Sequence, residues 1–158
     1  MSEGTHLDTF LAGLPRLAIQ SVPNETPIPR IRSVKPLISY NGFDGFQRMR
    51  TWEVAKWLMA LGAMPRPAIC DLCRGGAEQY HAENYFDFGS YISICRSCHA
   101  KVHNRLRNFD TWQKRRAELD LPASHWANGL KANDFPVALW CRHIGIREPT
   151  FADFVGKG

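Results

Sequence analysis

Two Cys-x2-Cys pairs constrain the fold of this chain more than any other feature. Cys70 and Cys73 form the first pair, Cys95 and Cys98 form the second, and 21 residues separate the two. This spacing is typical of a zinc site in which four thiolates bind the ion tetrahedrally and the intervening chain returns as a hairpin. Four sulfur ligands leave no position for a reacting water, so the predicted zinc stabilises the fold and does not catalyse. The alternatives are four unpaired buried cysteines or two disulfides.

Three histidines lie within or just after this pattern. His99 and His103 are four residues apart, so a helix over this segment places both rings on one face. His81 precedes the midpoint of the segment between the cysteine pairs. A hairpin closed by zinc would bring His81 near the start of that helix. A single histidine here would be an ordinary surface imidazole or a spare ligand, whereas three around one zinc unit indicate a second site.

The order of these residues resembles the HNH endonuclease family, which has a ββα-metal fold. The resemblance covers about residues 68–108, and it rests on Cys-x2-Cys, a strand with a histidine, and Cys-x2-Cys-His-x3-His. It implies that His81 is the general base that activates water. It also implies that His99 and His103 hold a second divalent metal, which could be Mg²⁺, Mn²⁺, Ni²⁺ or Zn²⁺. The implied reaction is metal-assisted hydrolysis of phosphodiester bonds, with DNA as the substrate by the resemblance alone.

Two positions depart from the family pattern. Tyr80 stands directly before the expected base, where the family has an Asp or His as a third metal ligand. Ser90 stands where the family places an Asn. Glu83 and Asn84 are the candidates for an additional ligand or an orienting residue. Glu83 shares a strand face with His81, because side chains alternate with a period of two along a strand.

The segment before the first cysteine pair predicts an amphipathic helix over about residues 46–61. Asn41 or Asp44 is expected to cap its start, and Gly62 is expected to end it. The aromatic residues of this segment are expected in the core. The predicted inner face approximates the helical period and consists of Phe46, Met49, Trp52 or Val54, Trp57 and Leu61.

The rest of the predicted secondary structure follows from alternation, turn residues and helical periodicity. Strands are expected at 78–86 and 91–94, and a helix carrying the two histidines is expected at about 96–108. A second helix is expected at 109–119, with Phe109, Trp112 and Leu119 on its inner side. Residues 136–143 and 150–155 are each expected to form a short helix or strand.

Residues 1–36 are expected to form an extended or disordered leader. They hold five of the ten prolines, which break helices and central strands, so at best a helical turn is expected at 10–14. The leader either wraps DNA or stays passive against the core. Residues 37–158 are expected to form a single domain. The overall class is therefore α+β, a small ββα-metal module stabilised by a four-cysteine zinc site, with flanking helices and an extended proline-rich N-terminal arm.

Positive charge is concentrated just after the second cysteine pair. The formal net charge of the chain is +5, and residues 96–116 hold seven basic residues against one acid, Asp110. The alternative to a nucleic-acid surface is a solvated helix face. Because these cations follow the predicted metal-binding helix, phosphates that approach the metal would meet them. The predicted nucleic-acid contacts are Arg96, Lys101, Arg105, Arg107, Lys114, Arg115 and Arg116.

Composition also indicates where the protein is found. No apolar run reaches 18 residues, so no membrane span is expected, and the N-terminus lacks the pattern of a secretory signal. Cys141 lies outside the two pairs and is expected to be a small buried residue in a reducing cytoplasm.

Three functions follow in order of preference. The first is a metal-dependent DNA endonuclease. The second is a non-catalytic zinc module that binds nucleic acid or a protein partner, and Tyr80 and Ser90 favour it. The third is a purely structural zinc domain, which leaves the basic segment 96–116 unexplained.

Overall fold

The computed structural model describes residues 3–28, 30 and 36–156. This part of the chain contains five α-helices and one two-stranded antiparallel sheet, which confirms the α+β class. No helix in it is both long enough and apolar enough to cross a membrane. The elements are α1 (Glu3–Ala12), α2 (Gly45–Ala60), β1 (Gln79–His81), β2 (Ile92–Ile94), α3 (Arg96–Asn104), α4 (Phe109–Glu118) and α5 (Val137–His143).

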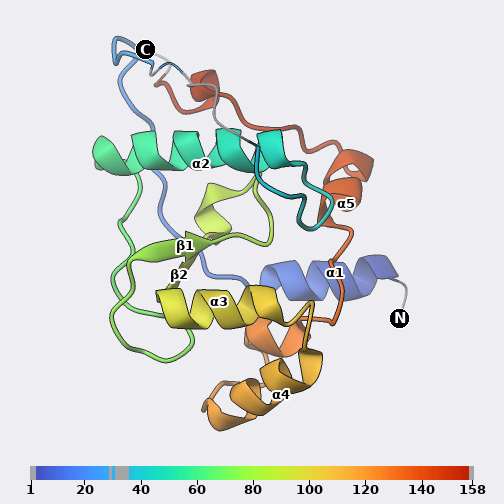
Figure 1. Cartoon of the computed structure of the whole chain (residues 1–158). Coiled ribbons are helices and arrows are strands. Elements are labelled where there is room, and N and C mark those ends of the chain that lie inside the picture. Colours follow the sequence, from blue (N-terminus) through green and yellow to red (C-terminus); the bar gives the residue numbers. More distant parts are fainter. Residues whose placement is uncertain (1–2, 29, 31–35, 157–158) are drawn as a thin grey trace.

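The β1–β2 hairpin lies between α2 and α3 in the view of Figure 1. Tyr80 pairs with Ser93 and His81 pairs with Ile92, so the two strands are antiparallel neighbours. Ile92 and Ile94 are fully buried. The first strand is shorter than predicted, because the chain leaves the ladder after His81. A turn follows at Asn84, whose Oδ1 accepts a hydrogen bond from the Phe86 N–H.

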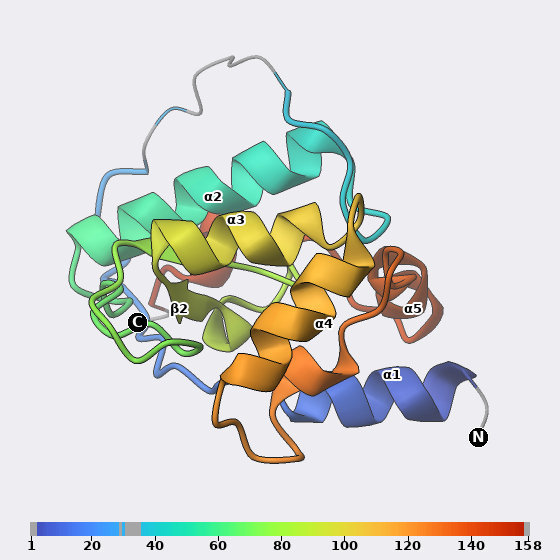
Figure 2. The same cartoon turned by 60° about the horizontal axis from the view of Figure 1, so that its bottom comes forward.

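The expectation of an extended leader is wrong for its first part, because residues 3–12 form α1. Leu7, Phe10, Leu11 and Leu14 are buried, and their spacing is that of one helical face. The phenyl ring of Phe10 stacks on that of Phe135, with centroids 4.5 Å apart. Figure 2 shows α1 beside the loop that follows α4. The prolines begin only after this helix and do not interrupt it.

The chain after α1 is extended and follows the core. This agrees with the alternative in which the leader stays passive against the core. The N–H of Leu17 bonds to the carbonyl of Gly89, and Val22 forms a parallel bridge with Val155. Residues 29 and 31–35 of the predicted leader lie outside the described residues.

Both predicted ends of α2 are confirmed, whereas its predicted inner face is only partly confirmed. Asp44 caps the helix and forms a reciprocal pair of hydrogen bonds with Gln47, and Gly62 follows the helix with a φ of +74°. Trp57 is buried as expected, and so is Val54, which was the alternative to Trp52. Phe46, Trp52 and Leu61 are exposed, whereas the buried face is formed by Thr51, Val54, Ala55 and Leu58. Apolar residues surround this helix, so periodicity alone did not identify the face that packs.

The two helices that follow the hairpin begin at the predicted residues. α3 begins at Arg96, with Cys95 as its N-cap, but ends at Asn104 and not near residue 108. α4 begins at Phe109 and buries Trp112 as expected. Segment 136–143 is a helix, α5, and Cys141 is fully buried as predicted.

Candidate metal centres

The four paired cysteines form one group, which we call the cysteine cluster. One sulfur from each of Cys70, Cys73, Cys95 and Cys98 lies within 4.8 Å of every other, and Cys73 Sγ is 3.9 Å from Cys95 Sγ. All of the cysteines are free thiols, which excludes the alternative of two disulfides. Sulfurs at tetrahedral positions about 2.3 Å from a zinc ion are separated by similar distances. The cysteine cluster is therefore positioned to bind a metal ion, and a four-thiolate donor set suits zinc.

The pKa values of two of these thiols are also consistent with a cation at the cysteine cluster. Burial opposes the Cys70 thiolate, but backbone N–H groups of Cys73, Cys95 and Leu72 outweigh it and lower the pKa of Cys70 to about 7. Burial and the neighbouring sulfurs raise the pKa of Cys98 to about 12. A fourth thiolate is therefore unfavourable in this cluster unless a cation balances the charge.

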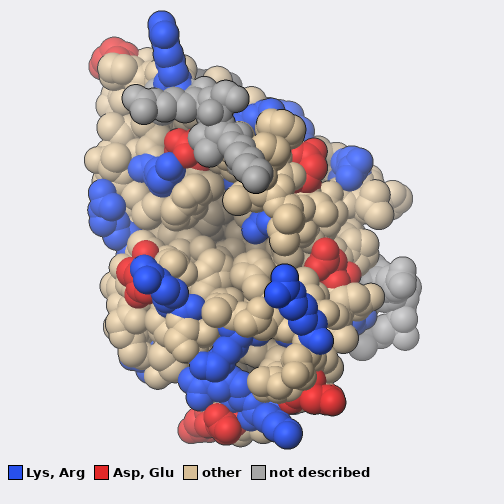
Figure 3. Space-filling view, viewed as in Figure 1, with Lys and Arg blue, Asp and Glu red and all other residues tan. Residues whose placement is uncertain are grey.

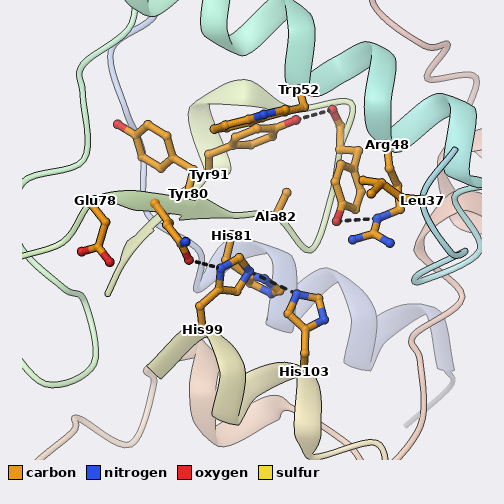
Figure 4. Close-up of a pocket in the computed structure, with 12 residues that line it drawn as sticks. Leu37, Arg48, Trp52, Glu78, Tyr80, His81, Ala82, Tyr91, His99 and His103 are labelled. Carbon is orange, nitrogen blue, oxygen red and sulfur yellow. Dashed lines mark hydrogen bonds between the residues drawn. The ribbon is translucent and has the colours of Figure 1, made fainter. Parts of the chain in front are cut away.

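The three histidines predicted to form a site come together beneath the hairpin. His81 comes from β1, while His99 and His103 come from one face of α3 (Figure 4). The ring centroids are 5.1 Å apart for His81 and His99, 5.0 Å for His81 and His103, and 4.9 Å for His99 and His103. The Nε2 atoms of the two α3 histidines are 3.1 Å apart. We call these three residues the histidine triad.

Glu83 fixes the imidazole of His81. His81 Nε2 is 2.6 Å from Glu83 Oε1, and both side chains are fully buried. Burial opposes the charged carboxylate, but the hydrogen bond from His81 and the nearby charge of Arg105 lower the pKa of Glu83 to about 2. A carboxylate acceptor requires Nε2 to carry a proton when the ring is neutral, so the lone pair is on Nδ1. This Nδ1 is buried and has no hydrogen-bond partner among the described residues.

Glu83 is itself held by residues from distant parts of the chain. The Tyr40 hydroxyl donates to Glu83 Oε1 at 2.7 Å, and the Asn41 amide donates to Glu83 Oε2. The Arg105 guanidinium donates to the Tyr40 oxygen at 3.0 Å and so places a buried positive charge near the carboxylate. A buried carboxylate is costly unless it is hydrogen-bonded and its charge is balanced, and this network supplies both.

The histidines of α3 are also arranged to offer lone pairs. The Gln79 side-chain oxygen accepts from His99 Nδ1 at 2.8 Å, so the lone pair of His99 is on Nε2, the atom that faces His103. Burial, with a smaller contribution from nearby positive charge, lowers the pKa of His99 to about 4 and that of His103 to about 3. Both rings are therefore neutral at pH 7, as metal binding requires.

Of the residues at and near the two departures from the family pattern, only Glu83 contacts the triad. Tyr80 alternates with His81 along β1, and its hydroxyl donates to the Pro65 carbonyl and not toward the triad. Asn84 caps the turn and lies beside Cys141, so it is not placed as a ligand. Ser90 is buried, and its hydroxyl donates to the Asp87 carbonyl. Of the two candidates for an orienting residue, Glu83 is the one that contacts His81.

The triad lies on the wall of a cavity of about 340 Å³ between α2, β1 and α3. Figure 4 shows Trp52 and Arg48 of α2 on the opposite side of this cavity, and Figure 3 shows that the surface is hollowed here. Tyr80, Tyr85 and Tyr91 complete an aromatic lining.

Most of the predicted phosphate-binding cations are on the surface of α3 and α4. Figure 3 shows Lys and Arg gathered over α4. Arg96, Arg107 and Lys114 are exposed, and the side chains of Lys101, Arg115 and Arg116 are half-buried. Arg105 contradicts the prediction, because it is 1% exposed and donates to Tyr40 and to the carbonyls of Val102 and Lys131. Its guanidinium is used inside the protein and does not face a phosphate.

Sequence reasoning missed Tyr40, Asn41, Arg48 and Gln79. The Asn41-Gly42 pair is a turn signal that was available, and both residues have positive φ. A turn signal does not reveal that Asn41 contacts a glutamate 42 residues later.

Protein-family models, curated proteins and solved structures were compared with this chain, and none of the three comparisons found a match.

Proposed function

We propose that this chain is a metal-dependent endonuclease of the HNH type that hydrolyses phosphodiester bonds of DNA. The observation that supports this most is the histidine triad, in which three imidazoles meet at a cavity with one ring nitrogen of each within 4.8 Å of the others. The triad is anchored by the adjacent cysteine cluster, since Cys98 and His99 are consecutive. The order of these residues is the one that resembles the family.

In this proposal, zinc at the cysteine cluster is structural and a second divalent metal binds the histidine triad. Imidazole donors favour Zn²⁺, Ni²⁺ or a similar transition metal, whereas Mg²⁺ prefers oxygen ligands. When bound, such a metal supplies an activated water and stabilises negative charge on the phosphate. Four cysteines kept as thiolates fit a reducing compartment such as the cytoplasm.

We propose that His81 is the third metal ligand, in place of the general-base role inferred from the family. A base needs a nitrogen that reaches a solvent water, and the free Nδ1 of His81 is buried among the other two rings. Its Nε2–H faces the Glu83 carboxylate, an arrangement that is common behind metal-binding histidines. In the family pattern the residue at the position of Tyr80 is the third metal ligand. His81, the next residue of β1, would supply the third ligand in this chain.

The residues around the triad would orient it and attract the substrate. Glu83, held by Tyr40 and Asn41, fixes the ring of His81, and Gln79 fixes the ring of His99. The exposed cations of α3 and α4 supply attraction to phosphates that does not depend on sequence. Arg105 has no part in that attraction and stabilises the network behind His81.

A second candidate is a non-catalytic zinc module that binds nucleic acid. The hydroxyl of Tyr80 faces away from the triad, and this observation favours it. In that case the exposed cations would still bind phosphate, and the three histidines would hold no metal.

The test is metal content and plasmid nicking, measured on the same samples. The wild-type chain is expected to retain one zinc after dialysis, and to bind one further Ni²⁺ or Zn²⁺ that switches on nicking. His81→Ala should keep the first ion and lose both the second ion and the nicking. The matched control is His143→Ala, which changes an exposed histidine outside the triad.

The outcomes separate the roles of His81. If His81→Ala still binds the second ion and loses only nicking, His81 is the base and not a ligand. If the wild-type chain binds one zinc, no second ion and does not nick, the nuclease proposal fails and the binding module is favoured.

A further inference from the structure

The three tyrosines that line the 340 Å³ cavity all have hydroxyls with hydrogen-bond partners in the described part of the chain. The Tyr80 hydroxyl donates to the Pro65 carbonyl, and the Tyr91 hydroxyl donates to the Tyr85 carbonyl at 3.2 Å. The Tyr85 hydroxyl accepts from Arg48 Nε at 2.9 Å. Because each of these hydroxyls already has a partner, the surface that the three tyrosines offer to a ligand is aromatic and apolar.

Trp52 lies on the α2 side of this cavity (Figure 4). It is a large apolar side chain that remains 36% exposed, although the helix has a complete buried face formed by other residues. Its indole therefore adds a stacking surface to the cavity and little to the core. Aromatic residues placed in this way bind planar rings.

Arg48 supplies a fixed positive charge on the same side. Its guanidinium lies 5.3 Å from the Tyr85 ring centroid, and Nη1 donates to the Ile38 carbonyl. No described carboxylate lies within ion-pair distance of it. Glu78, the one acid among the described residues that line the cavity, is near Arg96, so its charge is partly balanced. The cavity thus combines an apolar slot, a cation and the histidine triad.

We propose that this cavity binds an unpaired nucleobase next to the phosphate that is cleaved. The substrate would then be single-stranded DNA or DNA with an extruded nucleotide. The volume is at the low end for ligand pockets, about 300–1,000 Å³, which suits one planar ring system and not a duplex. A base inside a duplex is stacked on both faces and cannot enter such a slot. The base stacks on Trp52, and its phosphate lies between Arg48 and the triad.

This inference rests on the proposed nuclease function only for the position of the phosphate. Binding of the base is measured without cleavage, by fluorescence anisotropy on zinc-loaded protein with no second metal added. The probes are a labelled thymidine oligonucleotide and an abasic strand with the same number of phosphates. Since stacking of a base on an aromatic side chain favours binding by about tenfold or more, wild type should bind the thymidine strand about tenfold more tightly.

Variants of α2 identify the stacking residue. Trp52→Ala should bind both strands with the affinity of the abasic strand, whereas Trp52→Phe should keep most of the preference. Phe46→Ala removes another exposed aromatic residue of α2 that does not line the cavity, and should keep the full preference. A fully paired duplex, at equal phosphate concentration, should compete no better than the abasic strand.

Equal binding of thymidine and abasic strands by wild type overturns the inference, as does a preference that survives Trp52→Ala. A duplex that competes as well as the thymidine strand also overturns it. A base preference without nicking would refute the nuclease alone, and nicking without a base preference would refute the base pocket alone.

Discussion

Glu83 determines, at the scale of single residues, what His81 can do. It is fully buried, and its carboxylate accepts from His81, Tyr40 and Asn41. The negative charge selects the tautomer in which His81 Nδ1 carries a lone pair, and it makes that nitrogen a stronger ligand. Residue alternation predicted that Glu83 shares a strand face with His81, although the strand itself ends at His81.

We expect Glu83→Gln to lower the metal affinity of the histidine triad about 10- to 100-fold. The amide keeps the size of the side chain but loses the charge that orients His81. The measurement is a Ni²⁺ titration against a competing chelator, with zinc at the cysteine cluster monitored separately and expected to be unchanged. Glu78→Gln, at an exposed glutamate that does not contact His81, is the control. Unchanged Ni²⁺ affinity in Glu83→Gln would exclude a role for this carboxylate.

Arg105 and Arg107 are two residues apart and are expected to behave in opposite ways. We expect Arg105→Met to reduce the free energy of unfolding by about 3–5 kcal/mol, because it leaves the buried Glu83 carboxylate without a nearby cation. Arg107→Met, at an exposed position, should change stability by no more than about 0.5 kcal/mol and should weaken DNA binding. Urea unfolding and binding to a labelled oligonucleotide distinguish them. A stable Arg105→Met protein with weakened DNA binding would support the original assignment of Arg105 to phosphate.

At the scale of elements, α3 joins the two candidate metal centres. Cys95 caps its N-terminus and Cys98 lies in its first turn, while His99 and His103 lie on its face toward β1. A metal bound at the cysteines would therefore fix where the helix begins and how it is rotated. Any change at the cysteine cluster should displace the triad, whereas changes at the triad should leave the cluster intact.

We expect Cys95→Ser to lose zinc and to unfold the hairpin and α3, since a structural zinc contributes folding free energy directly. The serine hydroxyl can still accept from the Cys98 N–H at the start of the helix, so the expected loss comes from the missing metal ligand. Zinc content and far-ultraviolet circular dichroism, before and after a chelator, provide the measurement. Cys141→Ala changes the buried cysteine outside the cluster and should retain zinc. A folded Cys95→Ser protein without zinc would refute the structural role of the metal.

The whole molecule places three distant segments around one site. Residues 40–41 hold Glu83, β1 supplies His81, and α3 supplies two histidines and ends next to Arg105. α2 then covers the hairpin and adds Arg48 and Trp52 to the cavity (Figures 1 and 4). On another side of the molecule, α1 packs beside Phe135 and Gly129, so the N-terminal segment belongs to the core.

We expect Phe10→Ala to lower the free energy of unfolding by about 3–5 kcal/mol, because it removes a buried ring that stacks on Phe135. Asp8→Ala, on the exposed side of the same helix, is expected to have little effect on stability. Thermal unfolding of both variants tests this, and metal binding at the triad should survive in each. A small loss in Phe10→Ala would mean that α1 contributes little to the stability of the domain.

Prediction from the sequence succeeded where the signal is local. The spacing of the cysteines identified one cluster, the four-residue spacing of His99 and His103 put them on one face, and Asp44 and Gly62 marked the ends of a helix. Prediction from the sequence failed where tertiary packing decides which of several similar local patterns becomes buried. The buried face of α2 was predicted only in part, because apolar residues surround the helix. The helix α1 was missed because the prolines that follow it favour an extended chain.

The chemistry available to this protein can be read from the sequence: four thiols and three imidazoles at spacings that a hairpin and a helix bring together. Which atoms face one another depends on tertiary packing. Packing turned Tyr80 away from the triad, buried Arg105 behind Glu83, and left Trp52 exposed at the cavity. No local pattern encodes these outcomes, because the burial of a side chain and its hydrogen-bond partners depend on residues far away in the chain.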